Sequence, residues 1–363
     1  MALSPGRADL VASELVAVVV AVTPVGPQVL TVGAPTGVPR LPSGPLRAEH
    51  RSLQTSLRTW VEEQTGVELG YVEQLYTFAD RERVGPHHRL LSVSYLGLTR
   101  IEGGQDTGDD VGPDVDGDAD GTGGGAGTTP GGTTPGGTDP GGPRERGTGA
   151  TFAWRPWAEF LPWEDRRDPA SRALSESLRE RLLAWAETGG TEAVRLDRRV
   201  RVEAAFGVNR VSEASLQRYQ LLHEARLTAE TAAAARGRAG PGPNTDAEVV
   251  ALTGSRMLHD HRRILATGVD RLRAKIQYRP VVFELVPPEF TLGQLQACVE
   301  DIAGTTLHTQ NFRRLVQQQH LVEEAGGRVS ATGGRPAKLY RFRREVEFER
   351  YAAGTKLPLS RGY

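Results

Sequence analysis

The chain has 363 residues, of which 38% are hydrophobic and 25% are charged, and its formal net charge is −1. At roughly 100–200 residues per domain this length suits about two or three domains, and the neutral total excludes a chain that is basic throughout. A single cysteine, Cys298, excludes an intramolecular disulfide framework and a cysteine-rich zinc site, and it favours a reducing, cytoplasmic setting. The longest apolar run, residues 15–22, is far shorter than the roughly 20 residues of a membrane-spanning helix.

The N-terminal part of the chain is predicted to be an α/β region. Valine-rich and alternating apolar segments predict four strands, at residues 15–22, 28–32, 71–78 and 90–98. Between the second and third strands, residues 49–65 have a helical pattern that ends at Gly66, a residue suited to the left-handed conformation that follows a helix.

A long insert separates this region from the rest of the chain. Between Glu102 and Pro143 there are nine acidic residues and no Lys or Arg, and most other residues are Gly, Thr or Pro. Too few apolar side chains are present to offset the entropy cost of ordering the chain. We therefore expect residues 102–150 to form a disordered acidic segment.

The middle of the chain is predicted to be helical. Residues 151–168 are rich in tryptophan and are expected to pack as an irregular connection. Apolar residues at helical spacing then predict helices within residues 169–278, at 173–187, 211–236 and 256–278. In the last of these, His259 and His261 are only two residues apart and diverge on a helix, so a structural or interface role is favoured over metal binding.

The C-terminal third is basic, with fifteen Lys and Arg against eight Asp and Glu between Arg256 and Arg344. Thr291 is positioned to cap a helix that ends at Gly304, and a second helix is predicted over residues 309–320. A Gly-rich tip at residues 326–334 and an alternating strand at 335–342 follow. A helix, a turn, a second helix and a β-ribbon with a basic tip form the layout of a winged helix, predicted here over residues 279–350.

In the second of these helices, Phe312, Leu315 and Val316 form the predicted buried stripe. The stripe leaves four side chains towards solvent: Thr309, Gln310, Arg313 and Arg314. Such groups can read base edges in the major groove, while Arg and Lys on the wing neutralise phosphates. Two alternatives stay open, namely a winged helix that binds protein and a surface helix that happens to carry two arginines. Asn311 is also compatible with a helix-start residue that satisfies the backbone.

Residues 44–67, GPLRAEHRSLQTSLRTWVEEQTGV, resemble the diphosphate-binding box of the Nudix pyrophosphatases, G-x5-E-x7-R-E-U-x-E-E-x-G-U, in which U is a bulky aliphatic residue. With Gly44 as the first glycine, three residues fall on the arginine and the paired glutamates of the box: Arg58, Glu62 and Glu63. His50 and Thr59 stand where the family has glutamates, and the closing Gly66 comes one residue late. Diphosphate hydrolysis needs several convergent carboxylates to hold Mg²⁺ and activate water. We therefore expect no catalytic residues, although a scaffold without its chemistry can still bind a nucleotide.

Together the two ends of the chain resemble the Nudix-related transcriptional regulators of NAD metabolism, in particular their alphaproteobacterial group. The most specific blocks are YRPVVFEL, FTLGQLQ, NFRRLV and GGRPAKLYRFRRE, and further blocks are LPSGPLRAEHRSL, LRTWVEEQTGVELGYVEQLYTFADRER, WRPWAEFLPWEDRRD and HDHRRILATGVDRLRAKIQ. The resemblance implies an α+β multidomain fold. Its parts would be a Nudix-like α/β/α sandwich at residues 9–101 with 151–168, the helical middle section, and the C-terminal winged helix-turn-helix.

The resemblance also implies a function, that of a cytoplasmic repressor of NAD-biosynthesis genes. Such a regulator would sense an NAD-related nucleotide such as ADP-ribose, require no cofactor, and bind a palindromic double-stranded DNA operator as a homodimer. The alternative is a Mg²⁺-dependent Nudix nucleoside-diphosphate pyrophosphatase with an accessory domain.

The same resemblance implies the functional residues. The groove-facing set would be Thr309, Gln310, Asn311, Arg313 and Arg314. The wing contacts to phosphate would be Arg328, Arg335 and Lys338. The residues near the effector would be Arg58, Glu62, Glu63, Arg81 and Arg83, for which ordinary surface ion pairs are the alternative. No metal ligand is expected.

Overall fold

The computed structural model describes residues 10–33, 37–46, 51–79, 88–101, 144–145, 151–208, 210–233, 246–329 and 337–343. All but residues 144–145 of the expected disordered segment, residues 102–150, lie outside the described residues. The same is true of three of the predicted site residues: Arg81, Arg83 and Arg335. Among the described residues, no helix combines the length and the apolar composition needed to cross a membrane.

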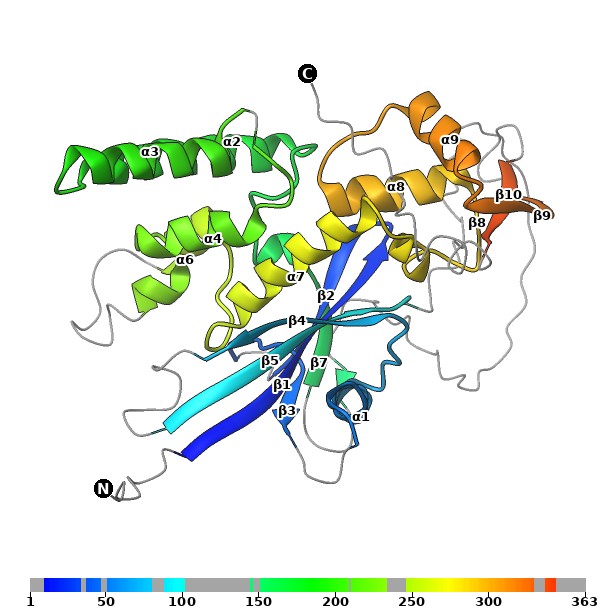
Figure 1. Cartoon of the computed structure of the whole chain (residues 1–363), viewed down its shortest axis with the longest axis horizontal. Helices are drawn as coiled ribbons and strands as arrows, with labels where there is room; N and C mark the ends of the chain where they lie inside the picture. Colours follow the sequence, from blue (N-terminus) through cyan, green and yellow to red (C-terminus); the bar gives the residue numbers. More distant parts are fainter. Residues whose placement is uncertain are drawn as a thin grey trace, which may run out of the picture.

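A seven-stranded mixed sheet forms the lower half of the molecule in Figure 1. Its strands are β1 (Leu10–Thr23), β2 (Gly26–Val32), β3 (Ser43–Pro45), β4 (Val72–Phe78), β5 (His88–Leu98), β6 (Arg144–Glu145) and β7 (Thr151–Pro156). The order is β4-β5-β1-β2-β7-β6, with β3 paired to β1 off this path. The pair β1–β5 is parallel and the other pairs are antiparallel. All four predicted strands are confirmed.

Helices cover both faces of the sheet because the central strand β1 is apolar on both sides. Leu15, Ala17 and Val19 pack towards α1 (Leu53–Thr65), in a core with Leu57 and Val61. The alternating residues Val16, Val18 and Val20 pack on the other face, towards α7 (His261–Ile276). Gly268 lets α7 approach this face closely, since an added Cβ would lie 2.7 Å from Val18 Cγ1. The predicted α+β class with a helix–sheet–helix arrangement is confirmed.

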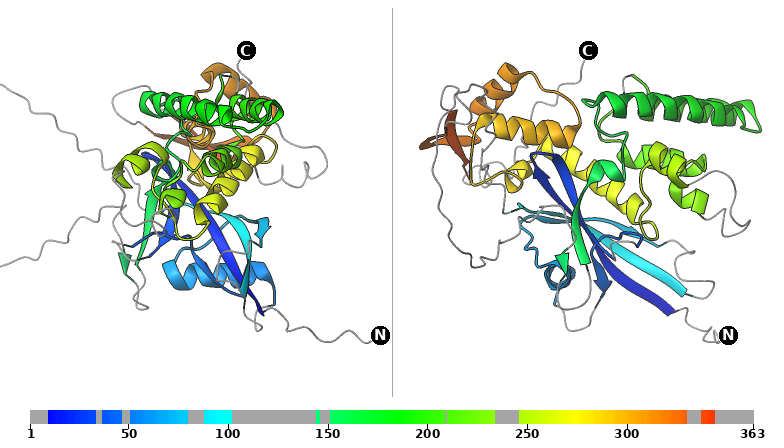
Figure 2. Two further views of the ribbon diagram at one scale, coloured as in Figure 1. Left: turned by 90° about the vertical axis from the view of Figure 1, so that its left-hand side faces the viewer. Right: turned by 180° about the vertical axis from the view of Figure 1, so that it is seen from behind.

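The middle of the chain forms helices above the sheet, on the side away from α1 (Figure 2). They are α2 (Pro169–Glu187), α3 (Glu192–Phe206), α4 (Ser215–Glu224), α6 (Asp246–Thr253) and α7. The α2 helix begins earlier than predicted, because the Asp168 side chain accepts hydrogen bonds from the backbone N–H groups of Ala170 and Ser171. The α2 and α3 helices form an antiparallel pair that projects from one end of the molecule (Figure 1).

Two sequence predictions in this part of the chain were wrong, and one helix was missed. Residues 151–156 form the strand β7 rather than an irregular connection, because β2 offers its free edge to them. The helix α3 was not predicted. The helix predicted over residues 211–236 is interrupted, since α4 ends at Glu224 and Arg226 adopts a left-handed φ of 58°. For β7, pairing with the distant strand β2 decided the local structure.

The C-terminal part has the order of a winged helix. Its elements are η2 (Val281–Glu284), β8 (Glu289–Phe290), α8 (Leu292–Ala303), α9 (Thr309–Gln318), β9 (Val322–Val329) and β10 (Ala337–Phe342). The three strands form an antiparallel sheet in the order β8-β10-β9. Thr291 and Gln294 form a reciprocal capping box at the start of α8, and Gly304 ends the helix at a φ of 64°, as predicted.

One hydrophobic core crosses all three regions. It extends from one face of the sheet through the middle helices into the winged helix, and includes Val18, Leu178, Leu222, Leu265, Val299 and Phe312. The predicted domain boundaries at residues 168 and 278 therefore stay a prediction. In the structure, the three regions share one hydrophobic core.

Candidate functional site

The exposed face of α9 is the candidate nucleic-acid interface. Phe312 and Val316 are buried and hold the helix against the core, while Leu315 is half-buried. The sides away from this core are polar and exposed, and they carry Gln310, Asn311, Arg313 and Arg314. Thr309 is exposed as well, but its Oγ1 faces α8, where it accepts from Gln296. The structure therefore brings together all five side chains of the predicted groove-facing set on one short helix.

Asn311 is the third residue of α9 and does not cap it. The capping position is held by His308, whose side chain makes no capping hydrogen bond. Within the described residues, the Asn311 side chain has no hydrogen-bond partner, and the same holds for the guanidinium groups of Arg313 and Arg314. These side chains are thus available to a ligand that approaches the helix from outside.

A buried amide fixes the angle at which α9 leaves α8. Gln296 Nε2 donates to Leu307 O over 3.1 Å and to Thr309 Oγ1 over 3.2 Å. Glu300 Oε1 accepts from Leu307 N over 2.7 Å and from Gln296 Nε2 over 3.0 Å. The turn between the two helices is therefore held by side chains of α8. Sequence reasoning missed Gln296 and Glu300. The signal that could have found Gln296 was a glutamine within the apolar stripe of a capped helix.

The wing carries paired and unpaired cations. Lys338 on β10 lies opposite Arg328 on β9, and Lys338 Nζ forms an ion pair with Glu324 Oε1 at 2.6 Å. Arg341 pairs similarly with Glu323 at 2.6 Å. Arg328 is exposed and has no ionic partner among the described residues. Of the two described wing cations in the predicted set, Arg328 is therefore free, whereas Lys338 is partly neutralised.

In the Nudix-like box, Arg58 acts on the backbone. Its guanidinium donates to Leu69 O and, over 2.9 Å, to Gly70 O. The helix α1 is capped at its start by Ser52, whose side chain accepts from Thr55 N, and at its end by Gly66, which has a φ of 69°. Arg58 therefore fastens α1 to the segment that leads into β4, and this contact explains an arginine at this position without a ligand.

The two acidic residues of the box, Glu62 and Glu63, are exposed on α1 and have no side-chain partner among the described residues. No group of three or more His, Cys, Asp or Glu side chains in the described part of the chain is arranged to hold a metal ion. Because Mg²⁺ requires near-octahedral oxygen ligands and Thr59 supplies no carboxylate, these residues do not fit a catalytic Mg²⁺ site. They can still accept hydrogen bonds from a bound nucleotide.

The segment fastened by Arg58 contacts the start of the winged helix. An added Cβ at Gly70 would lie 2.6 Å from Glu284 Oε2, so this η2 carboxylate rests directly on the Gly70 backbone. Arg100 Nη2, which follows β5, donates to Phe283 O over 2.7 Å. The Phe283 ring in turn stacks on Phe342 of β10, with ring centroids 4.2 Å apart. The Nudix-like box is thus joined to the wing through a short series of direct contacts.

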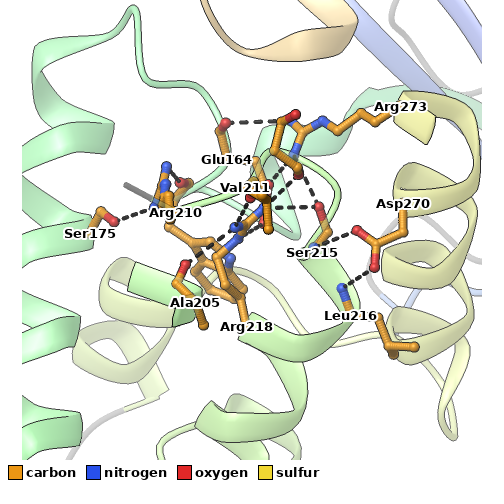
Figure 3. Close-up of polar contacts among 12 residues, drawn as sticks. Glu164, Ser175, Ala205, Arg210, Val211, Ser215, Leu216, Arg218, Asp270 and Arg273 are labelled. Atoms are coloured by element: carbon orange, nitrogen blue, oxygen red, sulfur yellow. Dashed lines mark hydrogen bonds and ion pairs between the residues drawn. The ribbon is translucent and has the colours of Figure 1, made fainter. Parts of the chain in front are cut away.

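A buried ionic cluster links the middle helices to α8 (Figure 3). Glu164 accepts two hydrogen bonds of 2.7 Å from Arg218 on α4 and a further hydrogen bond from Arg273 on α7. Arg273 Nε also donates to Ile302 O over 2.8 Å, at the end of α8. All three charged side chains are almost fully buried. Sequence reasoning missed this cluster because its members lie far apart along the chain.

The electrostatics of the cluster favour the ionised carboxylate. Burial alone would raise the pKa of Glu164, but attraction to Arg218 and Arg273 and the hydrogen bond from Arg218 outweigh it, so the pKa lies well below its usual range. Nearby, burial and repulsion from Arg218 lower the pKa of Arg210 to about 9. The ionised Glu164 carboxylate therefore lies between the positively charged side chains of Arg218 on α4 and Arg273 on α7.

His261 and Arg262 have structural roles. His261 Nδ1 accepts a hydrogen bond of 2.9 Å from Leu41 N, and the buried Arg262 Nη1 donates to Thr253 O over 2.6 Å. His259 adopts a left-handed φ of 52° just before α7 begins. These contacts agree with the structural interpretation of this motif.

Comparison with known proteins identifies the C-terminal region. Residues 282–342 match the family model of the NrtR DNA-binding winged helix domain. The ADPR responsive transcriptional repressor NtrR of Acinetobacter baylyi is 40% identical over 83 residues, which are 23% of this chain and 33% of that protein. The chain thus matches about one third of the length of this curated relative. The predicted resemblance to Nudix-related regulators of NAD metabolism is confirmed, and the domain match places its clearest signal in the winged helix.

The solved structures that the chain matches include a DNA complex. Shewanella oneidensis NrtR with a 27mer DNA is 17% identical, with 92% of this chain and 94% of that chain covered and a TM-score of 0.48. A MutT/nudix family protein from Enterococcus faecalis is 15% identical, with 94% and 90% covered and a TM-score of 0.48. The NUDIX domain of Shewanella oneidensis NrtR with ADP ribose is 26% identical, with 27% and 66% covered and a TM-score of 0.23.

Proposed function

We propose that this chain is a DNA-binding transcriptional repressor of NAD-biosynthesis genes whose Nudix-like region senses ADP-ribose or a related nucleotide. The observation that carries the proposal is the exposed face of α9, where Arg313 and Arg314 project from a helix whose preceding turn is held by the buried Gln296 side chain. This face belongs to the region that matches the NrtR DNA-binding winged helix domain. The name of the Acinetobacter relative supports both the repressor role and the ADP-ribose effector.

On DNA, α9 enters the major groove and its exposed polar groups meet base edges. An arginine can donate two hydrogen bonds to guanine, which is the commonest specific contact in such complexes. The wing lies over the adjacent backbone, where Arg328 and Lys338 approach phosphates; Arg335, outside the described residues, completes the predicted set. Two copies of the chain bind a palindromic operator, because a two-fold DNA site matches a two-fold protein.

The effector binds at the box formed by α1 and the segment after it. Glu62 and Glu63 remain candidate acceptors for hydroxyl groups of the nucleotide, and Arg81 and Arg83 remain candidates for its diphosphate. Arg58 acts on the site by shaping the backbone at Leu69 and Gly70. An effector that binds better to one arrangement of this segment favours that arrangement. Because Glu284 rests on the segment, the position of the winged helix shifts with it. The two sites are then coupled through the populations of the two arrangements.

The proposed regulator is not a hydrolase. Two exposed carboxylates on one helix do not provide the convergent ligands that metal-assisted diphosphate hydrolysis requires. Incubation of the purified chain with ADP-ribose and Mg²⁺ should therefore release no AMP above a protein-free control. Release of AMP that is lost in a Glu62→Gln, Glu63→Gln double variant would show a working Nudix site instead.

The experiment that tests the regulator is fluorescence anisotropy of the full chain on DNA from upstream of an NAD-biosynthesis gene in its source genome. Unlabelled random DNA serves as competitor, and ADP-ribose and NAD are added in separate titrations. Competitor-resistant binding that ADP-ribose changes is the expected result. Specific binding that neither nucleotide alters would remove the sensor part of the proposal, and binding no tighter than to random DNA would remove the assignment to these genes.

A further inference from the structure

The helix α3 has an exposed apolar face, which we call the α3 stripe. It consists of Ala193, Leu196, Val200 and Ala204, all exposed. Leu196 is 55% exposed and Val200 is 59% exposed. A single exposed aliphatic side chain is ordinary, whereas neighbouring ones on one face form an apolar patch. Spacings of three, four and four residues put the four side chains on one face, because a helix turns about 100° per residue.

The orientation of α3 is fixed by contacts on its other side, so the exposed stripe does not result from a loosely placed helix. Val202 and Phe206 are buried in the core. The Arg198 guanidinium lies over the Trp185 ring of α2, 4.1 Å from its centroid. Arg179 of α2 pairs with Glu203 at 2.6 Å. These contacts hold α3 against α2 and leave the stripe facing outward.

The stripe is complementary to itself when a second α3 runs antiparallel to it. The pairs Leu196 with Val200 and Ala193 with Ala204 are both centred on residues 198–199. A two-fold axis at that point therefore sets the large side chains of one copy opposite those of the other. The small residues meet at both ends, which lets the helices approach closely.

The charges beside the stripe follow the same symmetry. Asp197 and Arg201 lie on one flank, and their side chains are 66% and 41% exposed. Within one chain they form a pair at 3.6 Å, and Arg201 also pairs with Glu224 at 2.5 Å. Asp197 and Arg201 are centred on residue 199, so the axis that pairs the apolar residues also places Asp197 of one copy opposite Arg201 of the other. Opposite charges at such flanking positions set partner and orientation in paired helices.

We propose that the α3 stripe is a self-association surface, on which α3 of a second copy of this chain packs antiparallel. The inference rests on the homodimer part of the proposed function and assigns a surface to it. The α2–α3 pair lies at the opposite end of the molecule from β9 and β10 (Figures 1 and 2), so the pairing leaves the candidate DNA interface open. One helix pair buries less than the roughly 800 Å² per partner of a standard interface, and association without DNA is therefore weak. Binding of both copies to one operator strengthens it through effective concentration.

The test is sedimentation velocity of the full chain without DNA over a concentration series. The wild-type chain should shift from monomer to dimer with rising concentration, whereas Leu196→Glu and Val200→Glu should stay monomeric at every concentration. Val25→Glu is the matched control, because Val25 is 83% exposed in the turn between β1 and β2 and should leave the dimer unchanged. Circular dichroism melts of each variant check that the helices are intact.

A mixing experiment separates contacts between copies from contacts within one chain. Asp197→Arg and Arg201→Asp should each abolish the dimer, because they place like charges opposite one another. An equimolar mixture should associate again, since every flanking pair is then oppositely charged, and a role confined to one chain cannot be rescued by mixing. A wild-type chain that is monomeric at all concentrations, or a dimer that survives Leu196→Glu, overturns the proposal. Because no DNA is present, either result is independent of the operator-binding test.

Discussion

Arg218 holds Glu164 by two parallel hydrogen bonds of 2.7 Å in the interior of the protein, where both side chains are almost fully buried. The same carboxylate accepts from Arg273, whose Nε bonds the last turn of α8. Glu164 thus joins the segment after the sheet to two middle helices and, through Arg273, to the winged helix. Its neutralisation or removal therefore affects the packing of the winged helix on the rest of the molecule.

Replacement of the carboxylate by an amide should destabilise the protein. In Glu164→Gln two buried guanidinium groups lose their counter-charge, and removal of one partner from a buried pair typically costs about 3–5 kcal/mol. Urea denaturation at neutral pH measures the loss. The control is Glu203→Gln, which breaks the exposed pair with Arg179 and should cost less than about 1 kcal/mol. Equal losses in the two variants would show that the buried cluster contributes no more to the free energy of unfolding than an exposed ion pair does.

The same group predicts a dependence of stability on pH. The pKa of Glu164 lies below its ordinary value of 4.5 in the folded protein, because the two arginines outweigh the effect of burial. A carboxyl group with a lowered folded-state pKa adds stability that is complete above its unfolded pKa and declines as the pH falls below it. The free energy of unfolding should therefore fall more steeply between pH 5 and about 3 in the wild type than in Glu164→Gln. Parallel curves for the two proteins would contradict this assignment.

Loss of the groove-facing arginines should weaken specific DNA binding. Arg313→Ala and Arg314→Ala should each cost about 1–3 kcal/mol on the operator if the side chain contacts a base, and much less on random DNA. A side chain that contacts only phosphate would instead weaken both kinds of DNA and lower the slope of log K against log salt by about 0.9. Arg181→Ala, an exposed arginine of α2, is the control and should change neither value.

Removal of the acid beside Lys338 should strengthen DNA binding. Glu324 holds Lys338 Nζ at 2.6 Å and adds a negative charge to the surface that faces phosphate in the proposed complex. Glu324→Gln should raise the affinity for DNA several-fold at low salt, with little change in stability, because both side chains are about half-exposed. Lys338→Ala should have the opposite effect. Unchanged anisotropy curves for both variants would place this strand outside the DNA contact.

The glycine that ends α8 should not tolerate alanine. Gly304 has a φ of 64°, and an added Cβ would lie 2.4 Å from Glu164 O. Gly304→Ala should destabilise the protein by about 2 kcal/mol or more, through backbone strain and displacement of the Glu164 segment. Gly293→Ala, in the same helix, has its nearest neighbour 3.7 Å away and should be neutral or stabilising. Thermal melts of the two variants give the comparison directly.

The winged helix and the solvent-facing residues of its second helix could be predicted because their signals are local. The Thr291 cap, the Gly304 end and the apolar stripe at Phe312 and Val316 lie within a few turns of one another, and the structure keeps all of them. Once the buried side of a helix is known, its exposed side follows from the helical period. The solvent-facing set of α9 was therefore predicted from the sequence without any knowledge of distant contacts.

The remaining features depend on residues that are far apart in the chain. Residues 151–156 became a strand because β2 had a free edge, and Arg58 was directed to Leu69 and Gly70 by the fold of the segment after α1. Glu164, Arg218 and Arg273 meet only when three elements pack together. The sequence by itself thus determined the helical periods, the caps and the resemblance to the regulators. Only the tertiary structure decided which charged groups are buried together and which face of α3 is left uncovered. Both depend on packing between segments far apart along the chain, and the local sequence patterns do not indicate which distant segments come into contact.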